Sequence, residues 1–299
     1  MKKKGDDEDS SEEVTKTIDV GGFGLNCLCI LIVSLVALFL KFAPIPRSVG
    51  IHCDDVTIRK EYKGNTIGGP QIIILVSITT AIVILITEGI TSFYRRPTIP
   101  IRYKLGALKF GEFLYNSFNY YWGFFYGFAG YFLICCVIKI YCGRLRPNFL
   151  AVCDPDPATF ICDGSDVNRY GYTEDYHCRG DPRLVKDARE SFPSLHAASA
   201  AGSALYICAY LNAKITKPVL QPMRTLFQLL FVVLALVVSL QRITDNAHHW
   251  TDVLAGFIIG ILGAIYTLHC VVHWFTESNG IDIDFSTNGC VEHPHVKLS

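Results

Sequence analysis

Three short polar clusters interrupt the apolar pattern of this 299-residue sequence. They are KIYCGRLRP (139–147), SFPSLHAA (191–198) and QRITDNAHHWTDV (241–253). Each lies at the edge of a long apolar stretch, where charged groups close to hydrocarbon are costly and usually functional. Between them, the clusters carry cations, histidines, a serine and an aspartate, which are residue types suited to phosphoryl transfer.

The third cluster contains candidate nucleophiles. His248 and Asp252 are four residues apart, so on a helix they would face the same way. A carboxylate bonded to one imidazole nitrogen fixes the tautomer and leaves the lone pair of the other nitrogen pointing outward. His249 is three residues from Asp252 and could also reach it. Spacing alone therefore does not choose between the two histidines.

Cations of the three clusters would complement a phosphate dianion. Lys139, Arg146 and Arg242 could surround it, because arginine forms forked hydrogen bonds with phosphate oxygens. Such a clamp stabilises a transferring phosphoryl group without a metal ion. His196 would then protonate the leaving oxygen and later activate water. Residue types alone thus predict a phosphoryl-transfer site at a membrane surface.

Each of these residues also has an ordinary structural interpretation. Lys139 could extend to the membrane interface, Ser194 could cap a helix, and Asp252 could favour a first helical turn. Arg144 is expected to be solvated or to face lipid headgroups. The convergence of so many such residues on one side of the membrane favours the functional interpretation.

Six apolar stretches must position the clusters. A bilayer-spanning helix needs about 20 mostly apolar residues. The stretches lie near residues 22–43, 70–94, 119–141, 195–212, 225–240 and 252–275. The sequence therefore predicts an all-α, polytopic membrane protein with one six-transmembrane-helix domain (22–275). A disordered tail (1–21) and a C-terminal tail (276–299) would flank it.

The distribution of charge predicts orientation. Lys+Arg and Asp+Glu both number 27, so net charge gives no indication of nucleic-acid binding. Segment 95–109 is basic without acids, segment 212–224 adds basic residues, and lysines open the chain. The positive-inside rule then places both termini in the cytosol and loops 44–69, 142–194 and 241–251 outward. The plasma membrane is the expected location, with an internal membrane as the alternative.

Five of the twelve cysteines fall in the loops expected to face outward, where disulfides are allowed. They are Cys53, Cys142, Cys153, Cys162 and Cys178. Because the number is odd, at least one stays unpaired or binds another chain, and the pairing cannot be read from sequence. Zinc binding is the alternative, but no C-x₂-C pair occurs outside the predicted spans.

Small residues recur four positions apart in two of the predicted spans. Gly123 and Gly127 lie in the third, and Gly256 and Gly260 in the sixth. This spacing allows close contact between helices, so we expect tight packing there.

Together, the clusters resemble the motifs of the type 2 phosphatidic acid phosphatase superfamily and, within it, the animal lipid phosphate phosphatases. The motifs are Lys139-x₆-Arg146-Pro147, Pro193-Ser194-x-His196 and Arg242-x₅-His248-x₃-Asp252. The resemblance extends to HCDDVTIRKEYKGNTI (52–67) and CRGD (178–181), and covers about residues 20–275.

The resemblance implies a six-helix bundle, a phosphohistidine intermediate and magnesium-independent hydrolysis of lipid phosphates, with no cofactor or metal. It assigns His248 as the nucleophile, Asp252 as the residue that orients it, and His196 as the acid and base. The implied phosphate-binding residues are Lys139, Arg146, Ser194 and Arg242. The expected substrates are phosphatidic acid, lysophosphatidic acid, sphingosine 1-phosphate or ceramide 1-phosphate.

Two positions depart from the family's pattern. Leu195 stands where the second motif usually has glycine, and Gln241 stands where the third usually has serine. A glycine would allow closer approach and positive φ. Neither change removes an ionisable group, so activity is expected.

Other functions fit parts of the pattern. A phosphatase acting on another phosphate ester, or an enzyme transferring a phospho-headgroup between lipids, would use a similar clamp. A catalytically weak or silent lipid-binding relative would typically lack the nucleophile or the clamp lysine, and both are present here. The expected partners are lipid phosphates and the bilayer, with self-association as a homo-oligomer left open.

Overall fold

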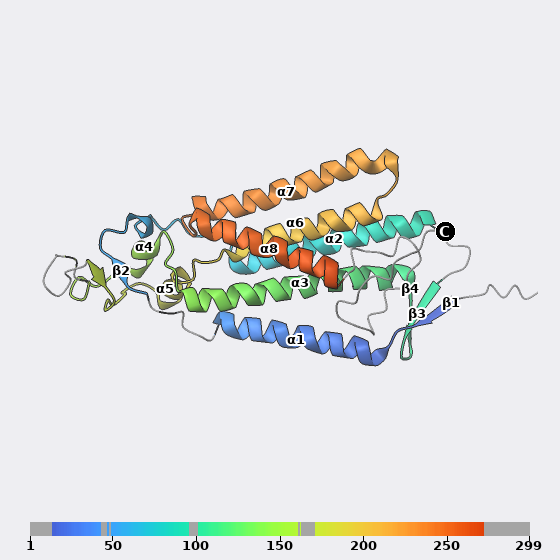
Figure 1. Cartoon of the computed structure of the whole chain (residues 1–299), viewed down its shortest axis with the longest axis horizontal. Helices are drawn as coiled ribbons and strands as arrows, with labels where there is room; N and C mark the ends of the chain where they lie inside the picture. Colours follow the sequence, from blue (N-terminus) through green and yellow to red (C-terminus); the bar gives the residue numbers. More distant parts are fainter. Residues whose placement is uncertain are drawn as a thin grey trace, which may run out of the picture.

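Long helices run side by side along the longest axis of the chain (Figure 1). The computed structural model describes residues 14–42, 47, 49–95, 101–160, 162 and 171–271. Within these residues the long helices are α1 (Val20–Phe42), α2 (Gly69–Arg95), α3 (Glu112–Cys142), α6 (Leu195–Lys214), α7 (Gln221–Thr244) and α8 (Trp250–Cys270). Each apolar stretch overlaps one of them, which confirms the prediction of a helical bundle. Residue 43 of the first stretch and residues 272–275 of the last lie outside the described residues.

Five of these helices are long and apolar enough to cross a membrane, and α6 is the exception among the described residues. Its sequence, LHAASAAGSALYICAYLNAK, is rich in alanine and serine, and most of its residues are buried. It packs against α2, α3, α7 and α8. A helix enclosed by others needs small residues that let its neighbours approach, because it presents little surface to lipid.

The glycines spaced four positions apart in α8 lie where this helix packs against α6. A Cβ atom added to Gly256 would lie 2.1 Å from the Ser194 carbonyl oxygen, and one added to Gly260 would lie 2.1 Å from that of Ala198. Gly127 of α3 gives the same close approach to Thr267 of α8, at 2.1 Å from Oγ1. The prediction of tight packing at these glycines is confirmed.

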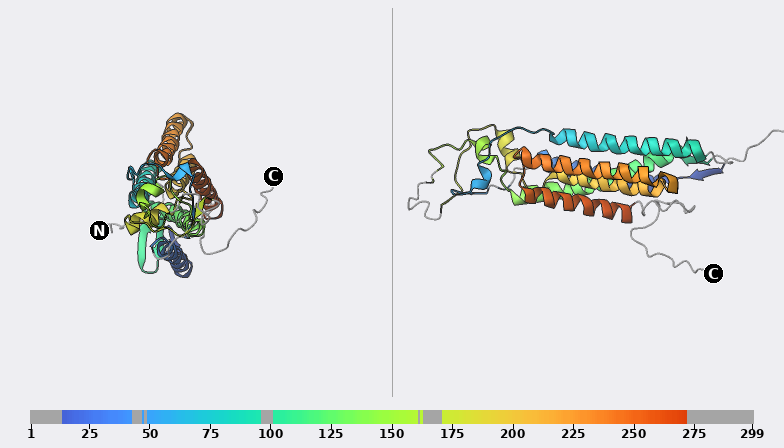
Figure 2. Two further views of the ribbon diagram at one scale, coloured as in Figure 1. Left: turned by 90° about the vertical axis from the view of Figure 1, so that its left-hand side faces the viewer. Right: turned by 90° about the horizontal axis from the view of Figure 1, so that it is seen from above.

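A cap of short elements covers one end of the bundle (Figure 2). Its elements are β2 (Ile51–His52), the 3₁₀ helix η1 (Val56–Ile58), α4 (Phe149–Cys153), β5 (Tyr172–Thr173) and α5 (Pro182–Ala188). β2 pairs antiparallel with β5. The cap has its own apolar core, which includes Ile51, Phe149 and Val185. It is therefore a packed layer that can hold helix ends in place.

Two disulfides cross-link the cap. Cys53 pairs with Cys162, and Cys153 pairs with Cys178, while Cys142 is free. The expectation that the loop cysteines pair and leave one over is thus confirmed. The Cys53–Cys162 bond joins the first loop of the cap to the long loop between α3 and α6, and the Cys153–Cys178 bond lies within that long loop.

A small sheet lies at the opposite end of the bundle. β1 (Val14–Thr17) pairs parallel with β3 (Ile101–Leu105), which pairs antiparallel with β4 (Leu108–Gly111). The 3₁₀ helix η3 (Pro218–Leu220) connects α6 to α7 nearby.

The predicted disordered tail (1–21) needs correction from residue 14 onward. Residues 14–17 form β1 because they satisfy backbone groups at the open edge of β3, and helix α1 already begins at Val20. Residues 1–13 and the predicted C-terminal tail (276–299) lie outside the described residues.

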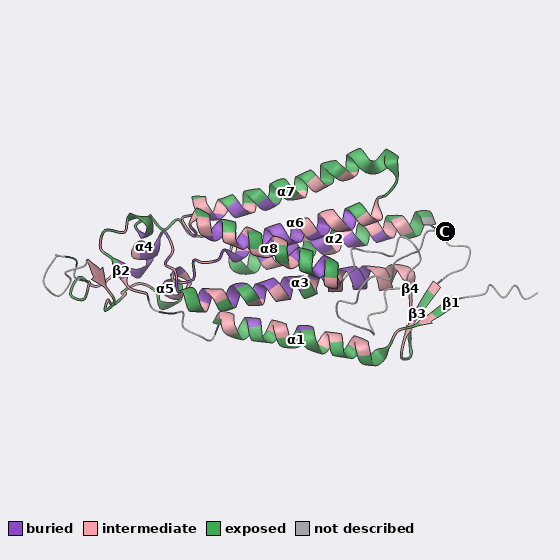
Figure 3. Cartoon of the chain, in the orientation of Figure 1, coloured by how far each residue is buried: buried purple, intermediate pink, exposed green. Residues whose placement is uncertain are grey.

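Burial follows the position of each helix in the bundle (Figure 3). α1 and α7 expose apolar side chains along most of their length, whereas α6 and the facing side of α3 are buried. The exposed apolar surface of α1 and α7 fits contact with lipid chains. The centre of the bundle is therefore α6, whose first turn lies under the cap.

We expect Gly260→Ala to destabilise the protein by about 1–3 kcal/mol, because its methyl group would overlap the Ala198 carbonyl. The measurement is the thermal unfolding midpoint in detergent. Gly130→Ala is the matched control, since a Cβ there meets nothing within 4 Å. Equal midpoints for the two variants would contradict the close contact of α6 and α8.

Candidate active site

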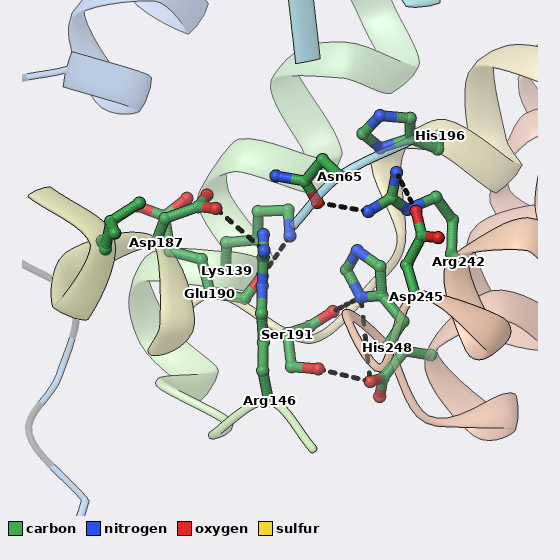
Figure 4. A network of polar contacts seen from close by, with 12 residues as sticks. Asn65, Lys139, Arg146, Asp187, Glu190, Ser191, His196, Arg242, Asp245 and His248 are labelled. Carbon is green, nitrogen blue, oxygen red and sulfur yellow. Dashed lines mark hydrogen bonds and ion pairs between the residues drawn. The ribbon is translucent and has the colours of Figure 1, made fainter. Parts of the chain in front are cut away.

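The three polar clusters meet at the capped end of the bundle (Figure 4). Lys139 lies in the last turn of α3, and Arg242 lies in the last turn of α7. His196 lies in the first turn of α6, and His248 lies in the loop between α7 and α8. The structure thus brings the predicted residues together from helices that are far apart in sequence.

Local sequence explains why each helix ends at the site. Gly143 has a φ of 56° and ends α3, and its backbone N–H donates to the Lys139 carbonyl. That left-handed conformation favours glycine, because other residues are strained there. Ser194 caps α6, and its Oγ accepts from the Ala197 N–H at 3.4 Å. The predicted N-cap role of Ser194 is therefore observed, and its hydroxyl hydrogen is left to donate elsewhere.

His248 is held by a backbone carbonyl. Its Nδ1 lies 2.7 Å from the Ser191 carbonyl oxygen. A carbonyl can only accept, so Nδ1 carries the hydrogen and the lone pair is on Nε2. Burial lowers the pKa of His248 well below its usual value, and the charges of Arg146 and Lys139 lower it further against the opposing effect of Asp252. The imidazole is therefore neutral near pH 7, as a nucleophile requires.

Asp252 lies beside His248, as the sequence-based argument predicted, but the distance is that of an ion pair and not of a short hydrogen bond. His248 precedes α8, so the helical spacing to Asp252 does not apply, and Nδ1 lies 3.9 Å from Oδ2. Instead, Oδ2 accepts from the Ser191 hydroxyl at 2.6 Å and from the His249 backbone N–H at 2.9 Å. The same oxygen lies 3.1 Å from His249 Nδ1. Asp252 therefore acts on His248 through Ser191.

The predicted clamp cations are buried and bound to protein acceptors. Lys139 is only 5% exposed and donates to the Glu190 carbonyl, so it does not extend to the interface. Arg146 pairs with Asp187, with 2.8 Å between Nη1 and Oδ2. Burial raises the pKa of Asp187, but Arg146, Lys41 and Lys139 outweigh this and lower it to about 2.

Arg242 and His196 share one acceptor. Arg242 donates to Asn65 Oδ1 at 2.5 Å and to the Ile67 carbonyl at 2.6 Å. His196 Nε2 lies 3.0 Å from the same carbonyl. The Nε atoms of Arg146 and Arg242 are buried without a hydrogen-bond partner among the described residues. These two N–H groups can donate to an anion, because nothing in the described chain uses them.

The sequence model of the PAP2 superfamily matches residues 120–275, a segment that contains all three motifs. The chain belongs to the PAP2 superfamily. It is 33% identical to phospholipid phosphatase 2 of Rattus norvegicus over 264 residues, covering 85% of this chain and 87% of that protein. It is 32% identical to phospholipid phosphatase 1 of Rattus norvegicus over 272 residues, with 85% and 87% covered. No solved structure matches the chain.

With the phosphatases of this family as relatives, the chain is a hydrolase of the phosphatase class and an integral membrane protein. The matched segment, residues 120–275, contains the polar clusters that the structure brings together. Neighbouring residues of this PAP2 chain support the clusters.

Arg144 is the first such neighbour. It was expected to be solvated or to face lipid headgroups, and its side chain is 40% exposed. Its Nη1 also lies 2.5 Å from Asp252 Oδ1 and donates to Thr251 Oγ1 at 2.8 Å. It therefore neutralises the carboxylate that holds Ser191. The only sequence signal was its place two residues before Arg146 in the first motif.

The second neighbour is the segment from Lys60 to Ile67, which we call the strap. Its backbone begins at the first motif, where Lys60 N donates to Pro147 O at 2.8 Å. It ends at the carbonyl that binds His196 and Arg242. Thr66 donates to both oxygens of Asp245, from N at 2.9 Å and from Oγ1 at 2.8 Å. The strap thus connects all three motifs. The sequence signal was the resemblance of residues 52–67 to the family, which did not indicate this role.

Both departures from the PAP2 pattern are accommodated. Gln241 Nε2 donates to Asp245 Oδ1 at 2.9 Å and to Thr66 Oγ1 at 3.2 Å, so its longer amide fastens the strap. Leu195 begins α6 without positive φ and packs into the main apolar core. The backbone there does not need a glycine in this chain.

We expect the His248 ring to stay neutral through the usual histidine transition near pH 6.5, because burial lowers its pKa well below that value in the folded protein. Histidine-selective labelling and NMR would show a His248 resonance, identified by its loss in His248→Ala, that does not titrate through this transition. Unfolded His248 binds a proton near pH 6.5, so its burial makes stability fall as pH drops below that value. A His248 resonance that titrates near pH 6.5 in folded protein would contradict the buried, neutral ring.

Proposed function

We propose that this PAP2 protein is a lipid phosphate phosphatase that acts through a phosphohistidine on His248. The observation that carries the proposal is a buried neutral imidazole with Nδ1 fixed by Ser191 and with Arg146 and Lys139 acting on it. The relatives named phospholipid phosphatase 1 and 2 support a phospholipid-derived substrate. Phosphatidic acid, lysophosphatidic acid, sphingosine 1-phosphate and ceramide 1-phosphate share the monoester that this site would recognise.

In the first step, His248 Nε2 attacks phosphorus, and the bond from phosphorus to the lipid oxygen breaks. His196 gives its proton to the leaving alkoxide, which departs as the lipid alcohol. Lys139, Arg146, Arg242 and the Ser194 hydroxyl hold the phosphate oxygens, so the charge of the transition state is met by fixed donors. Arg146 and Arg242 each have an unused Nε–H for this purpose.

In the second step, His196 takes a proton from water as its oxygen attacks the phosphorus of phospho-His248. The bond from phosphorus to nitrogen breaks, and inorganic phosphate forms. Asp252 supports both steps through Ser191, because it fixes the carbonyl that keeps the hydrogen on Nδ1. The mechanism requires no metal. Among the described residues, no three His, Cys, Asp or Glu side chains are grouped to hold one.

We also propose that all six long helices cross the membrane, with both termini in the cytosol and the cap outward. The two disulfides of the cap support this orientation, since disulfides persist on the oxidising side of a membrane. A site at the helix ends lies at the depth of lipid headgroups, where the phosphate of a membrane lipid is found. The plasma membrane is the proposed location.

We expect His248→Ala to lower phosphate release from short-chain phosphatidic acid by about 10⁴-fold or more, because nothing else there can accept the phosphoryl group. His249→Ala should lose about tenfold or less, since His249 only caps α8 and bonds Asp252. Excess EDTA should not change wild-type activity.

Controls for this comparison are the thermal midpoints of both variants in detergent. Loss of activity in His249→Ala with activity kept in His248→Ala would reassign the nucleophile. An activity abolished by EDTA and restored by Mg²⁺ or Zn²⁺ would contradict the metal-independent mechanism.

We expect His196→Ala to stall after the first step when p-nitrophenyl phosphate is the substrate. Nitrophenolate is a good leaving group that needs no proton, whereas hydrolysis of the intermediate still needs a base. Rapid-quench kinetics should show a burst near one equivalent per site, followed by slow turnover. Acid-labile label should accumulate on the protein and be absent from the variant that also carries His248→Ala. Slow turnover without a burst or label would limit His196 to positioning phosphate.

A further inference from the structure

Lys41 reaches the site from a helix that contributes nothing else to it. It lies in the last turn of α1, and its Nζ is 2.5 Å from Glu190 Oε2 and 3.7 Å from Asp187 Oδ1. These two acids are the neighbours of the clamp cations. Glu190 accepts from Lys139 through its backbone carbonyl, and Asp187 pairs with Arg146.

The Glu190 carboxylate could compete for Lys139, because the Lys139 ammonium already donates to the backbone carbonyl of the same residue. Figure 4 shows the two residues next to each other, and they are 3% and 5% exposed. A buried carboxylate without a partner is costly, and the nearest clamp cation would satisfy it. A lysine paired with an internal carboxylate would bind a phosphate oxygen less well. A cation other than Lys139 must therefore bind the Glu190 carboxylate.

We propose that Lys41 is a positioning residue that keeps the Glu190 carboxylate away from Lys139. By binding Oε2, Lys41 leaves only the neutral Glu190 carbonyl as the partner of Lys139. The charge of Lys139 is then available to the phosphate of the substrate. This inference rests on the proposed function, in which Lys139 is a phosphate ligand.

The alternative role for Lys41 is a simple positive charge that attracts the substrate. The two roles differ in their dependence on Glu190. If Lys41 acts by occupying Glu190, its removal does harm only while residue 190 carries a carboxylate. If Lys41 attracts phosphate itself, its removal does the same harm with Glu190→Gln present. A double-mutant cycle separates them.

The experiment measures KM and kcat for short-chain phosphatidic acid in detergent micelles, together with the inhibition constant of inorganic phosphate. The variants are Lys41→Met, Glu190→Gln and the double variant. Lys186→Met is the matched control. Lys186 belongs to α5 and contacts the same end of α1, where it donates to the Phe42 carbonyl at 2.8 Å. Lys41→Ala, which likewise removes the partner of Glu190, replaces Lys41→Met in the cycle if the latter does not fold.

We expect Lys41→Met to raise both KM and the phosphate inhibition constant about tenfold, the scale of one weakened charge-assisted hydrogen bond. kcat should change less. In the Glu190→Gln background the same substitution should change both constants less than about twofold. Lys186→Met should stay within about twofold of wild type.

Equal effects of Lys41→Met in both backgrounds would overturn the proposal, as would wild-type constants in Lys41→Met itself. Wild-type activity and the loss of phosphate affinity in Lys139→Ala are measured first. If either is absent, the proposed function fails and this inference fails with it. If both are present, a negative result in the cycle concerns Lys41 alone.

Discussion

The hydrogen bond between His248 Nδ1 and the Ser191 carbonyl is the contact on which the rest of the site depends. The Ser191 backbone is fixed by its own N–H, which donates to the Arg144 carbonyl at 2.9 Å, and its hydroxyl is fixed by Asp252. Asp252 in turn accepts the Ser194 N–H on its carbonyl at 2.9 Å. That contact requires α8 to lie directly against the start of α6, which Gly256 allows. Helix packing and imidazole tautomer are thus parts of one chain of contacts.

The cations of the site keep positive charge that can attract an anionic ligand. Arg146 and Arg242 each have a carboxylate partner, Asp187 at 2.8 Å and Asp245 at 3.4 Å, whereas Lys139 donates to a carbonyl. Arg242 also donates to an amide oxygen and a carbonyl. Neutral acceptors satisfy the geometry of a cation without cancelling its charge. Two nearby acids also have other partners: Glu190 binds Lys41, and Asp245 accepts two hydrogen bonds from the strap besides its ion pair with Arg242. A dianion would therefore meet preformed donors that need little rearrangement.

Much of the helical architecture could be predicted because apolar length and charge position are local properties of the sequence. The same holds for Lys139, His196 and Arg242, which stand at helix ends recognisable from Pro147, Ser194 and the return to apolar residues. The residues that sequence reasoning missed act across long separations. Lys41 meets Glu190 149 positions away, and Asn65 meets Arg242 177 positions away, and no periodicity encodes such pairs.

The helical geometry expected for His248 and Asp252 was wrong for a related reason. It assumed a helix through both residues, whereas the cap at His249 starts α8 one residue later. The order of residues 14–17 was missed because a strand of four residues needs a partner edge, and that edge comes from residues 101–105.

The low hydropathy of α6 has a consequence for how the protein is made. Helices are sorted into the bilayer at the translocon according to their free energy of transfer, and charged or weakly apolar segments partition poorly when alone. If α6 crosses the membrane, it has to enter together with partners that shield it. Lys214 at the other end of α6 adds to the cost of inserting this helix alone, because its Nζ pairs with Glu88 of α2 inside the bundle, at 3.0 Å. Biogenesis would then be cooperative, with α6 retained near the translocon until α7 and α8 emerge from the ribosome. The helix that carries His196 would then become committed to the membrane only together with helices that are made after it.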